Sequence, residues 1–198
     1  MSMVLKLAGL GLMLAPLPAL AQDDAVLKAF GSCVVSADAA GARALIALEP
    51  QSGQSRDAAR KFVDKKSACG AAFTKDRPDA AAVRGAIAER LYLDSFAAAP
   101  AAIVGPPAPF EGSGQPGQVL YDVTRCAASR DPVAADQLVR SAPASADEKA
   151  AMQRLIAAIG NCTPGGAKVG FNRAQLRAMT AEGIYKVRNA TAVPGATN

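Results

Sequence analysis

Apolar residues recur along this chain at the spacing of amphipathic helices, and the whole pattern occurs twice. When the sequence is shifted by 93 residues, the distance from Cys33 to Cys126, positions 26–93 align with 119–186 without a gap. The aligned positions share apolar, polar and cysteine residues: Val26/Val119, Leu27/Leu120, Asp38/Asp131, Leu45/Leu138, Pro50/Pro143, Ser52/Ser145 and Cys69/Cys162. A long ungapped self-alignment of this kind predicts two copies of one structural unit.

The first half of each unit predicts two helices. The first helix carries its apolar residues on one face: Val26, Phe30, Cys33 and Val34, repeated as Val119, Val123, Cys126 and Ala127. The second helix begins after Asp38 or Asp131, since aspartate is a good N-cap. It ends at Pro50 or Pro143, because proline cannot continue a helix.

The second half of each unit predicts two more helices. The third opens near Ser52 or Ser145 and runs to the second cysteine of its unit. Ser145 and Glu148 have the spacing of a capping box. The fourth begins after Asp79 or Asn172, so each unit is expected to hold four helices.

The pattern divides the chain into five segments. They are a signal peptide at 1–21, helical repeat 1 at 22–93, a Pro/Gly/Ala-rich linker at 94–118, helical repeat 2 at 119–186 and a flexible tail at 187–198. The first segment has Lys6, a short apolar run and the ending Ala19-Leu20-Ala21, which is typical of a cleaved secretory signal. We therefore expect an exported protein, periplasmic or extracellular, with no transmembrane segment in the mature chain.

Composition favours an all-α fold and excludes several kinds of chemistry. Of 198 residues 46 are alanine, the best helix former, and none is tryptophan. The chain also has no histidine, which excludes Ser/His/Asp and Cys/His nucleophile systems and histidine metal sites. We expect no metal and no other cofactor. The formal charge of +5 is scattered rather than clustered, so no nucleic-acid partner is predicted.

Four cysteines in an exported chain predict disulfide bonds. The duplication favours Cys33 with Cys69 and Cys126 with Cys162, because both copies then carry the same bridge across 36 residues. Bridges between the repeats are the structural alternative. A redox or metal site is the functional one, although the chain has no C-x-x-C motif.

The fourth helix of each unit carries a duplicated polar set opposite its apolar stripe. The set is Arg84, Glu89 and Tyr92 in repeat 1 and Arg177, Glu182 and Tyr185 in repeat 2. The same face holds small residues such as Ala81, Gly85 and Ala88, so another helix can approach it closely. Three interpretations follow: a structural network within or between the units, a polar ligand site present twice, or a catalytic role for the glutamates.

These features resemble a group of secreted alphaproteobacterial, sphingomonad-like proteins with a duplicated two-cysteine helical repeat. The likeness rests on Cys33-Val34-Val35, the 36-residue cysteine spacing, and the ending Arg84-x-x-Ile87-Ala88-Glu89-x-Leu91-Tyr92. No activity is assigned to that group, so the resemblance implies export and the duplicated unit but no chemistry. The second copy departs from it at Thr180, where the first has Ile87.

The sequence thus predicts two tandem four-helix repeats, each stapled by one disulfide. We expect a non-enzymatic binding protein or a structural or interaction module of the cell envelope, whose partner is a protein or a small polar ligand. A third hypothesis is a basic module that associates with the envelope through its charge. The alternative is a hydrolase- or lyase-type enzyme with Glu and Tyr as its acid and base.

Overall fold

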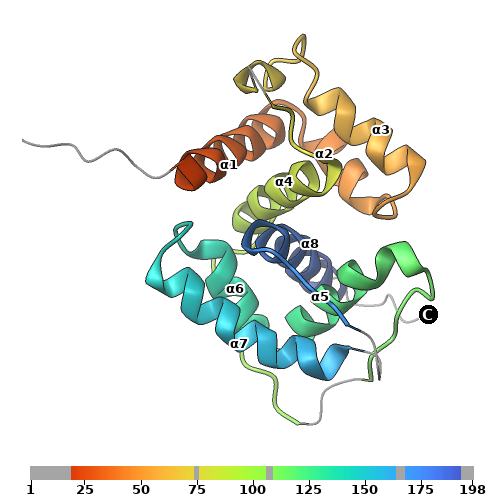
Figure 1. Cartoon of the computed structure of the whole chain (residues 1–198), viewed down its shortest axis with the longest axis vertical. Helices are drawn as coiled ribbons and strands as arrows, with labels where there is room; N and C mark the ends of the chain where they lie inside the picture. The colour runs from red at the N-terminus through yellow and green to blue at the C-terminus, as the bar shows by residue number, and fades with distance from the viewer. Residues whose placement is uncertain (1–18, 74–75, 106–108, 164–167, 193–198) are drawn as a thin grey trace, which may run out of the picture.

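The computed structural model describes residues 19–73, 76–105, 109–163 and 168–192 of the chain. All regular structure in these ranges is helical, which confirms the all-α prediction (Figure 1). Repeat 1 contains α1 (Ala19–Ala37), α2 (Ala39–Ala47), α3 (Gly53–Phe62), the 3-10 turn η1 (Gly70–Ala72) and α4 (Ala80–Ser95). After the 3-10 turn η2 (Pro116–Gln118), repeat 2 contains α5 (Val119–Arg130), α6 (Pro132–Arg140), α7 (Ala146–Cys162) and α8 (Arg173–Ala192).

The two repeats lie side by side, and the fourth helix of each is at the centre (Figure 1). Helices α4 and α8 pack against each other, while α1 covers α4 and α5 covers α8. The remaining helices, α2 and α3 in one repeat and α6 and α7 in the other, lie on the outer sides. Residues of both repeats therefore share one core, which includes Ile87, Tyr92, Val123 and Ile184.

The predicted N-caps form in both copies. Asp38 accepts a hydrogen bond from Gly41 N at 2.7 Å, and Asp131 accepts one from Ala134 N at 2.9 Å. The later caps are Ser52 to Ser55 N, Ser145 to Glu148 N, Asp79 to Ala82 N and Asn172 to Gln175 N. Each cap satisfies an amide that the helix leaves without a partner.

The two predicted disulfides are present. Cys33–Cys69 and Cys126–Cys162 each tie the first helix of a repeat to the region after or at the end of its third helix. Each closes a loop of 36 residues, worth about 4 kcal/mol in the chain-entropy description of the unfolded state. A repeat of this size has a small core, so such a bridge is a large share of its stability.

The third helices differ between the repeats. We predicted that both run to the second cysteine; α7 does, but α3 ends at Phe62, seven residues before Cys69. The reason is the side chain of Ser67, which bonds to the backbone in both directions. Ser67 Oγ donates to Phe62 O at 2.7 Å and accepts from Gly70 N at 2.9 Å. These bonds compete with helical ones and turn the chain.

The last helix is longer than expected. Helix α8 continues to Ala192, so 187–192 of the predicted flexible tail are helical. Arg188 explains part of this, since its guanidinium donates to Tyr92 Oη at 3.1 Å and to Ala98 O at 2.9 Å. Residues 193–198 of the tail, and 1–18 of the predicted signal peptide, lie outside the described residues.

Within the described ranges, no single helix is both long and apolar enough to cross a membrane. The segments Asp24–Ala37 and Ala39–Ala47 reach that length and composition only together, and they are bent by 112° at their junction. Their apolar residues Phe30, Leu45 and Ile46 are buried inside the protein.

Candidate functional site

The duplicated polar set lies where the two repeats meet. Helices α4 and α8 approach each other closely at Gly85 and Ala178: a Cβ atom added to Gly85 would lie 2.3 Å from Ala178 Cβ. Only glycine allows this approach without a shift of one helix. The small-residue face of α4 is therefore turned toward the other repeat.

Arg84 of repeat 1 binds Glu182 of repeat 2. Its Nε donates to Glu182 Oε2 at 2.9 Å and its Nη2 to Oε1 at 2.6 Å. The remaining guanidinium hydrogens bond to the end of α2 and to α3: to the carbonyls of Leu45, Ile46 and Leu48, and to Ser55 Oγ. Arg84 thus joins the repeats and also satisfies carbonyls that α2 leaves free at its C-terminus.

Arg177 of repeat 2 makes the reciprocal contact with Glu89 of repeat 1. Its Nε and Nη2 each donate to one Glu89 oxygen at 3.0 Å. The other bonds reach Leu138 O, Val139 O, Ser141 O and Oγ, and Glu148 Oε1. The arginines and glutamates of the polar set therefore form a network: the ion pairs run between the repeats, and the other bonds of each arginine stay within its own repeat.

These pairs are buried and charged. Arg84 and Glu182 are almost fully buried, and Arg177 and Glu89 nearly so. Burial lowers the pKa of Arg177, but its bonds to Glu89 and Glu148 outweigh burial and raise the pKa above its ordinary value. Removal of one partner of such a buried pair strongly destabilises the fold, because the remaining charge is then buried without its partner and is poorly solvated.

The tyrosines of the predicted set do not join this network. Tyr92 Oη donates to Asp136 Oδ1 at 2.5 Å and accepts from Arg188 Nη1. Arg140 completes the cluster through its ion pair with Asp136 at 2.9 Å. Burial and the bond to Asp136 raise the pKa of Tyr92. Tyr185 makes no side-chain hydrogen bond within the described ranges, so the two tyrosines occupy different environments.

Two buried polar residues of this region were not predicted from the sequence as partners of the polar set. The Asp136 carboxylate accepts a hydrogen bond from Tyr92 Oη. The Glu148 carboxylate accepts hydrogen bonds from both Arg177 and Arg173. The signal for Asp136 was its spacing of four from Arg140, which suits a helical ion pair. Glu148 was assigned only to a capping box, where its oxygen does accept a backbone bond, but from Ala144 N.

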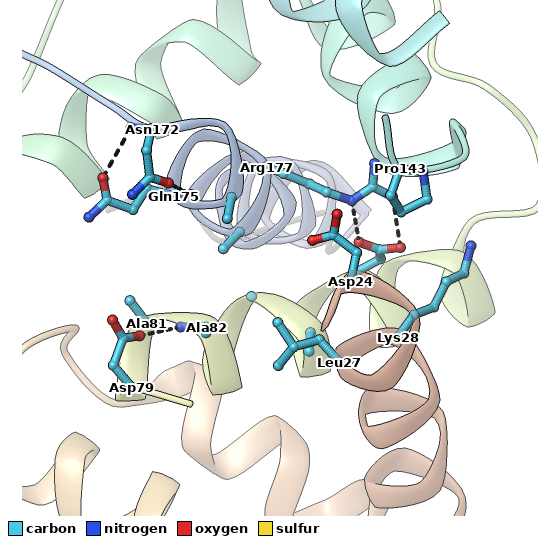
Figure 2. Close-up of a pocket in the computed structure, with 15 residues that line it drawn as sticks. Asp24, Leu27, Lys28, Asp79, Ala81, Ala82, Pro143, Asn172, Gln175 and Arg177 are labelled. Atoms are coloured by element: carbon cyan, nitrogen blue, oxygen red, sulfur yellow. Dashed lines mark hydrogen bonds and ion pairs between the residues drawn. The ribbon is translucent and has the colours of Figure 1, made fainter. Parts of the chain in front are cut away.

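A cavity of about 170 Å³ lies beside the Glu89–Arg177 pair. It is bounded by α1, by the N-terminal halves of α4 and α8 and by Pro143 of the α6–α7 loop (Figure 2). Its apolar wall is formed by Leu27 and by the small residues of the crossing, such as Ala82, Ala174 and Ala178. Polar side chains reach it from several elements: Asp24, Lys28, Asp79, Glu89, Gln175 and Arg177.

Two of the acidic groups at this cavity have partners that hold them in place. Asp24 at the start of α1 forms an ion pair with Arg173, which also binds Glu148 at 3.1 Å. Asp79 caps α4 through Ala82 N at 2.8 Å. Arg173 has an alanine, Ala80, at the equivalent position of repeat 1, so this extension of the network is found on one side only.

The equivalent place in repeat 2 is different. A second cavity, of about 270 Å³, lies beside Glu182 and is lined by Glu49, Asp122, Arg125, Tyr121 and Lys186. Lys186 Nζ donates to Glu182 Oε1 at 2.7 Å. Burial and the nearby Glu182 charge raise the pKa of Tyr121. The polar ligand site that the duplication predicts twice is therefore not built the same way twice.

Glu89 and Tyr92, the candidate acid and base, both have partners within the protein. Glu89 and Tyr92 lie on the same helix, but their polar ends contact Arg177 and Asp136. The described residues contain no group of three or more His, Cys, Asp or Glu side chains that could hold a metal ion. Comparisons with protein-family models, curated proteins and solved structures give no match to this chain.

Proposed function

We propose that this protein is an exported, non-catalytic binding protein that holds a small ligand between its two repeats. The observation that carries the proposal is the cavity beside Glu89 and Arg177, which is bounded by three helices and a loop. A binding site of this kind needs a shaped, mostly apolar space and a few placed polar groups. The groups here are fixed by ion pairs and caps, which is favourable for recognition because little order has to be gained on binding.

The binding proposal is tested by filling the cavity. Ala174 is an exposed residue of α8 on the cavity wall, so Ala174→Leu would occupy the space without burying a new residue in the core. Ala190 is exposed on the same helix and is not among the cavity residues, so Ala190→Leu is the matched control. In a fragment screen followed by protein NMR, we expect hits that shift amides of Gly85 and Ala178 and are lost in Ala174→Leu but kept in Ala190→Leu. A screen with no hit at these amides would overturn the proposal.

Export is part of this proposal. Residues 1–21 have the pattern of a secretory signal, and two disulfides are typical of an oxidising compartment. We place the protein in the periplasm or outside the cell, as the resemblance to secreted alphaproteobacterial proteins also implies. Mass spectrometry of the protein from its native cells should give a chain that begins at Gln22. A chain that retains residues 1–21 would contradict the cleavage.

The alternative, a hydrolase- or lyase-type enzyme, has weaker support. Its proposed acid and base would be Glu89 and Tyr92, and each is engaged by its own buried partner. A general base must be free to take a proton from the substrate. If Glu89→Gln abolished a turnover found by screening while the unfolding midpoint stayed the same, the enzyme would replace the binding protein as the better proposal.

A further inference from the structure

The two buried glutamates have different numbers of hydrogen-bond donors, although they occupy equivalent positions. Glu182 accepts two bonds from Arg84 and a third from Lys186 Nζ at 2.7 Å. Glu89 accepts two bonds from Arg177, and the position equivalent to Lys186 is Leu93, which has no donor. Within the described chain, Glu89 thus has no third donor.

The Glu89 carboxylate, which still has acceptor positions without a donor, lines the cavity. A carboxylate has about four acceptor positions, so Glu89 keeps sites for further donors after Arg177 is bound. Its side chain is 11% exposed, against 2% for Glu182, and it is one of the residues that line the cavity. Arg177 has no comparable capacity, because its hydrogens bond to Glu89, Glu148 and the end of α6.

We propose that the cavity binds a small primary amine whose ammonium group donates to the Glu89 carboxylate. The ligand's ammonium would donate a hydrogen bond to Glu89, as Lys186 Nζ donates to Glu182. Repeat 2 therefore makes with its own lysine the contact that repeat 1 would make with a ligand. This inference rests on the proposed binding function and specifies its ligand class.

The rest of the cavity fits the apolar body of such an amine. Leu27, Ala82, Ala174 and Ala178 provide a wall of aliphatic groups. The volume of about 170 Å³ is close to that of an engineered apolar cavity, about 150 Å³, that takes up benzene. An amine with one ring or a short alkyl chain matches this space.

The side chains that line the cavity include one more acidic than basic group, which suits a cationic ligand: Asp24, Asp79 and Glu89 against Lys28 and Arg177. Asp24 and Glu89 each already have an arginine partner. Lys28 on α1 lines the cavity and also a small space of about 20 Å³ that Glu89 lines as well, without an ion pair to that carboxylate. Lys28 therefore competes with the ligand, and removal of its charge should strengthen amine binding.

Three probes of one shape test the ligand class: benzylamine, benzyl alcohol and benzoate. They are titrated at pH 7 into the purified, oxidised protein and followed by amide NMR shifts of Gly85, Ala86 and Ala178. We expect benzylamine to bind at least about tenfold more tightly than benzyl alcohol, the difference that a hydrogen bond to a charged group brings, and benzoate to bind most weakly.

Leu93→Lys is the decisive variant, since it places in repeat 1 the lysine that repeat 2 already has. Its ammonium should occupy Glu89 and weaken benzylamine binding by about tenfold, while benzyl alcohol binding stays unchanged. Leu93→Met is the matched control and should bind benzylamine like the wild type. Glu89→Gln should show the same selective loss, and Lys28→Met should bind benzylamine about twofold more tightly.

The outcomes separate the ligand class from the binding function. If benzyl alcohol or benzoate binds at these amides as tightly as benzylamine, the amine is wrong and the binding function stands. If Leu93→Lys and Lys28→Met both leave benzylamine affinity unchanged, Glu89 is not its partner and the inference fails. If neither the three probes nor the fragment screen shifts these amides, the proposed function fails as well.

Discussion

The two ends of the interface between α4 and α8 are related by the internal repeat, but their buried ion pairs have different partners. At one end Arg84 binds a single carboxylate, Glu182, and Lys186 adds a third donor to it. At the other end Arg177 binds two carboxylates, Glu89 and Glu148, and Glu89 has no third donor. The duplicated residues are the same at both ends; the difference comes from the unmatched pairs around them.

Two of these unmatched pairs explain most of the difference. Position 55 is serine in repeat 1, whereas its equivalent in repeat 2 is Glu148, so only Arg177 has a second acidic partner. Position 93 is leucine, whereas its equivalent is Lys186, so only Glu182 has a cation four residues along its helix. The two duplicated pairs thus differ in their partners and in exposure, since the Glu89 side chain is 11% exposed and the Glu182 side chain 2%.

The largest expected effect tests this difference directly. Glu182→Gln leaves Arg84 without any carboxylate in a site where it is 1% exposed, and we expect a loss of about 3–5 kcal/mol in the free energy of unfolding. Glu89→Gln leaves Arg177 with Glu148, so we expect a loss of about 1–2 kcal/mol. Urea unfolding of the oxidised protein measures both values. Equal losses would mean that Glu148 does not compensate for Glu89.

A smaller effect is expected where the helices cross. Gly85→Ala places a Cβ 2.3 Å from Ala178 Cβ, and the resulting overpacking should cost about 1–3 kcal/mol. Ala178→Gly alone should cost about 1 kcal/mol, the difference in helix propensity.

The double variant Gly85→Ala/Ala178→Gly moves the small residue to the opposite helix. The exchange removes the Cβ–Cβ clash, but the added Cβ would still lie 2.5 Å from Ala178 Cα. It should therefore recover only part of the space, and its cost should lie somewhat below the sum of the two single losses. A double-mutant cycle by urea unfolding gives the coupling. Simple additivity would show that the Ala178 Cβ adds nothing to the cost of Gly85→Ala.

Much of the local structure could be predicted because it depends on neighbours in the sequence. The caps at Asp38, Asp79 and Ser145 bind amides three residues away, and the duplication selected one disulfide pairing out of three. Helix α3 departs from the prediction because Ser67 bonds to the backbone of Phe62 and Gly70. The spacing of apolar residues does not reveal that these side-chain bonds compete with helical ones.

The partners of the polar set could not be predicted in the same way. Arg84 and Glu89 are five residues apart, which places them about 140° apart around one helix, so each needs a partner elsewhere. Which glutamate each arginine binds depends on how α4 and α8 cross, and that is a property of the assembled core. The cavity depends on the same crossing, and on Pro143 and α1 beside it.

The last comparison is between the two tyrosines, of which Tyr185 has the smallest expected effect of all. Tyr92→Phe removes a hydrogen bond to the buried Asp136 carboxylate, and we expect a loss of about 1.5–3 kcal/mol at neutral pH. Tyr185→Phe removes no side-chain hydrogen bond of the described structure, so its loss should be below about 0.5 kcal/mol, as for changes that break no specific interaction.

The pH dependence makes the comparison sharper. The pKa of Tyr92 is raised in the folded protein, so the unfolded chain loses this proton first as the pH rises. The Tyr92 contribution is therefore complete below about pH 10, the ordinary tyrosine pKa, and is lost as the pH rises through the folded pKa. The difference in unfolding free energy between wild type and Tyr92→Phe should shrink above pH 10. If the Tyr92→Phe difference does not change with pH, the Tyr92–Asp136 bond does not stabilise the fold, and the two tyrosines are equivalent after all.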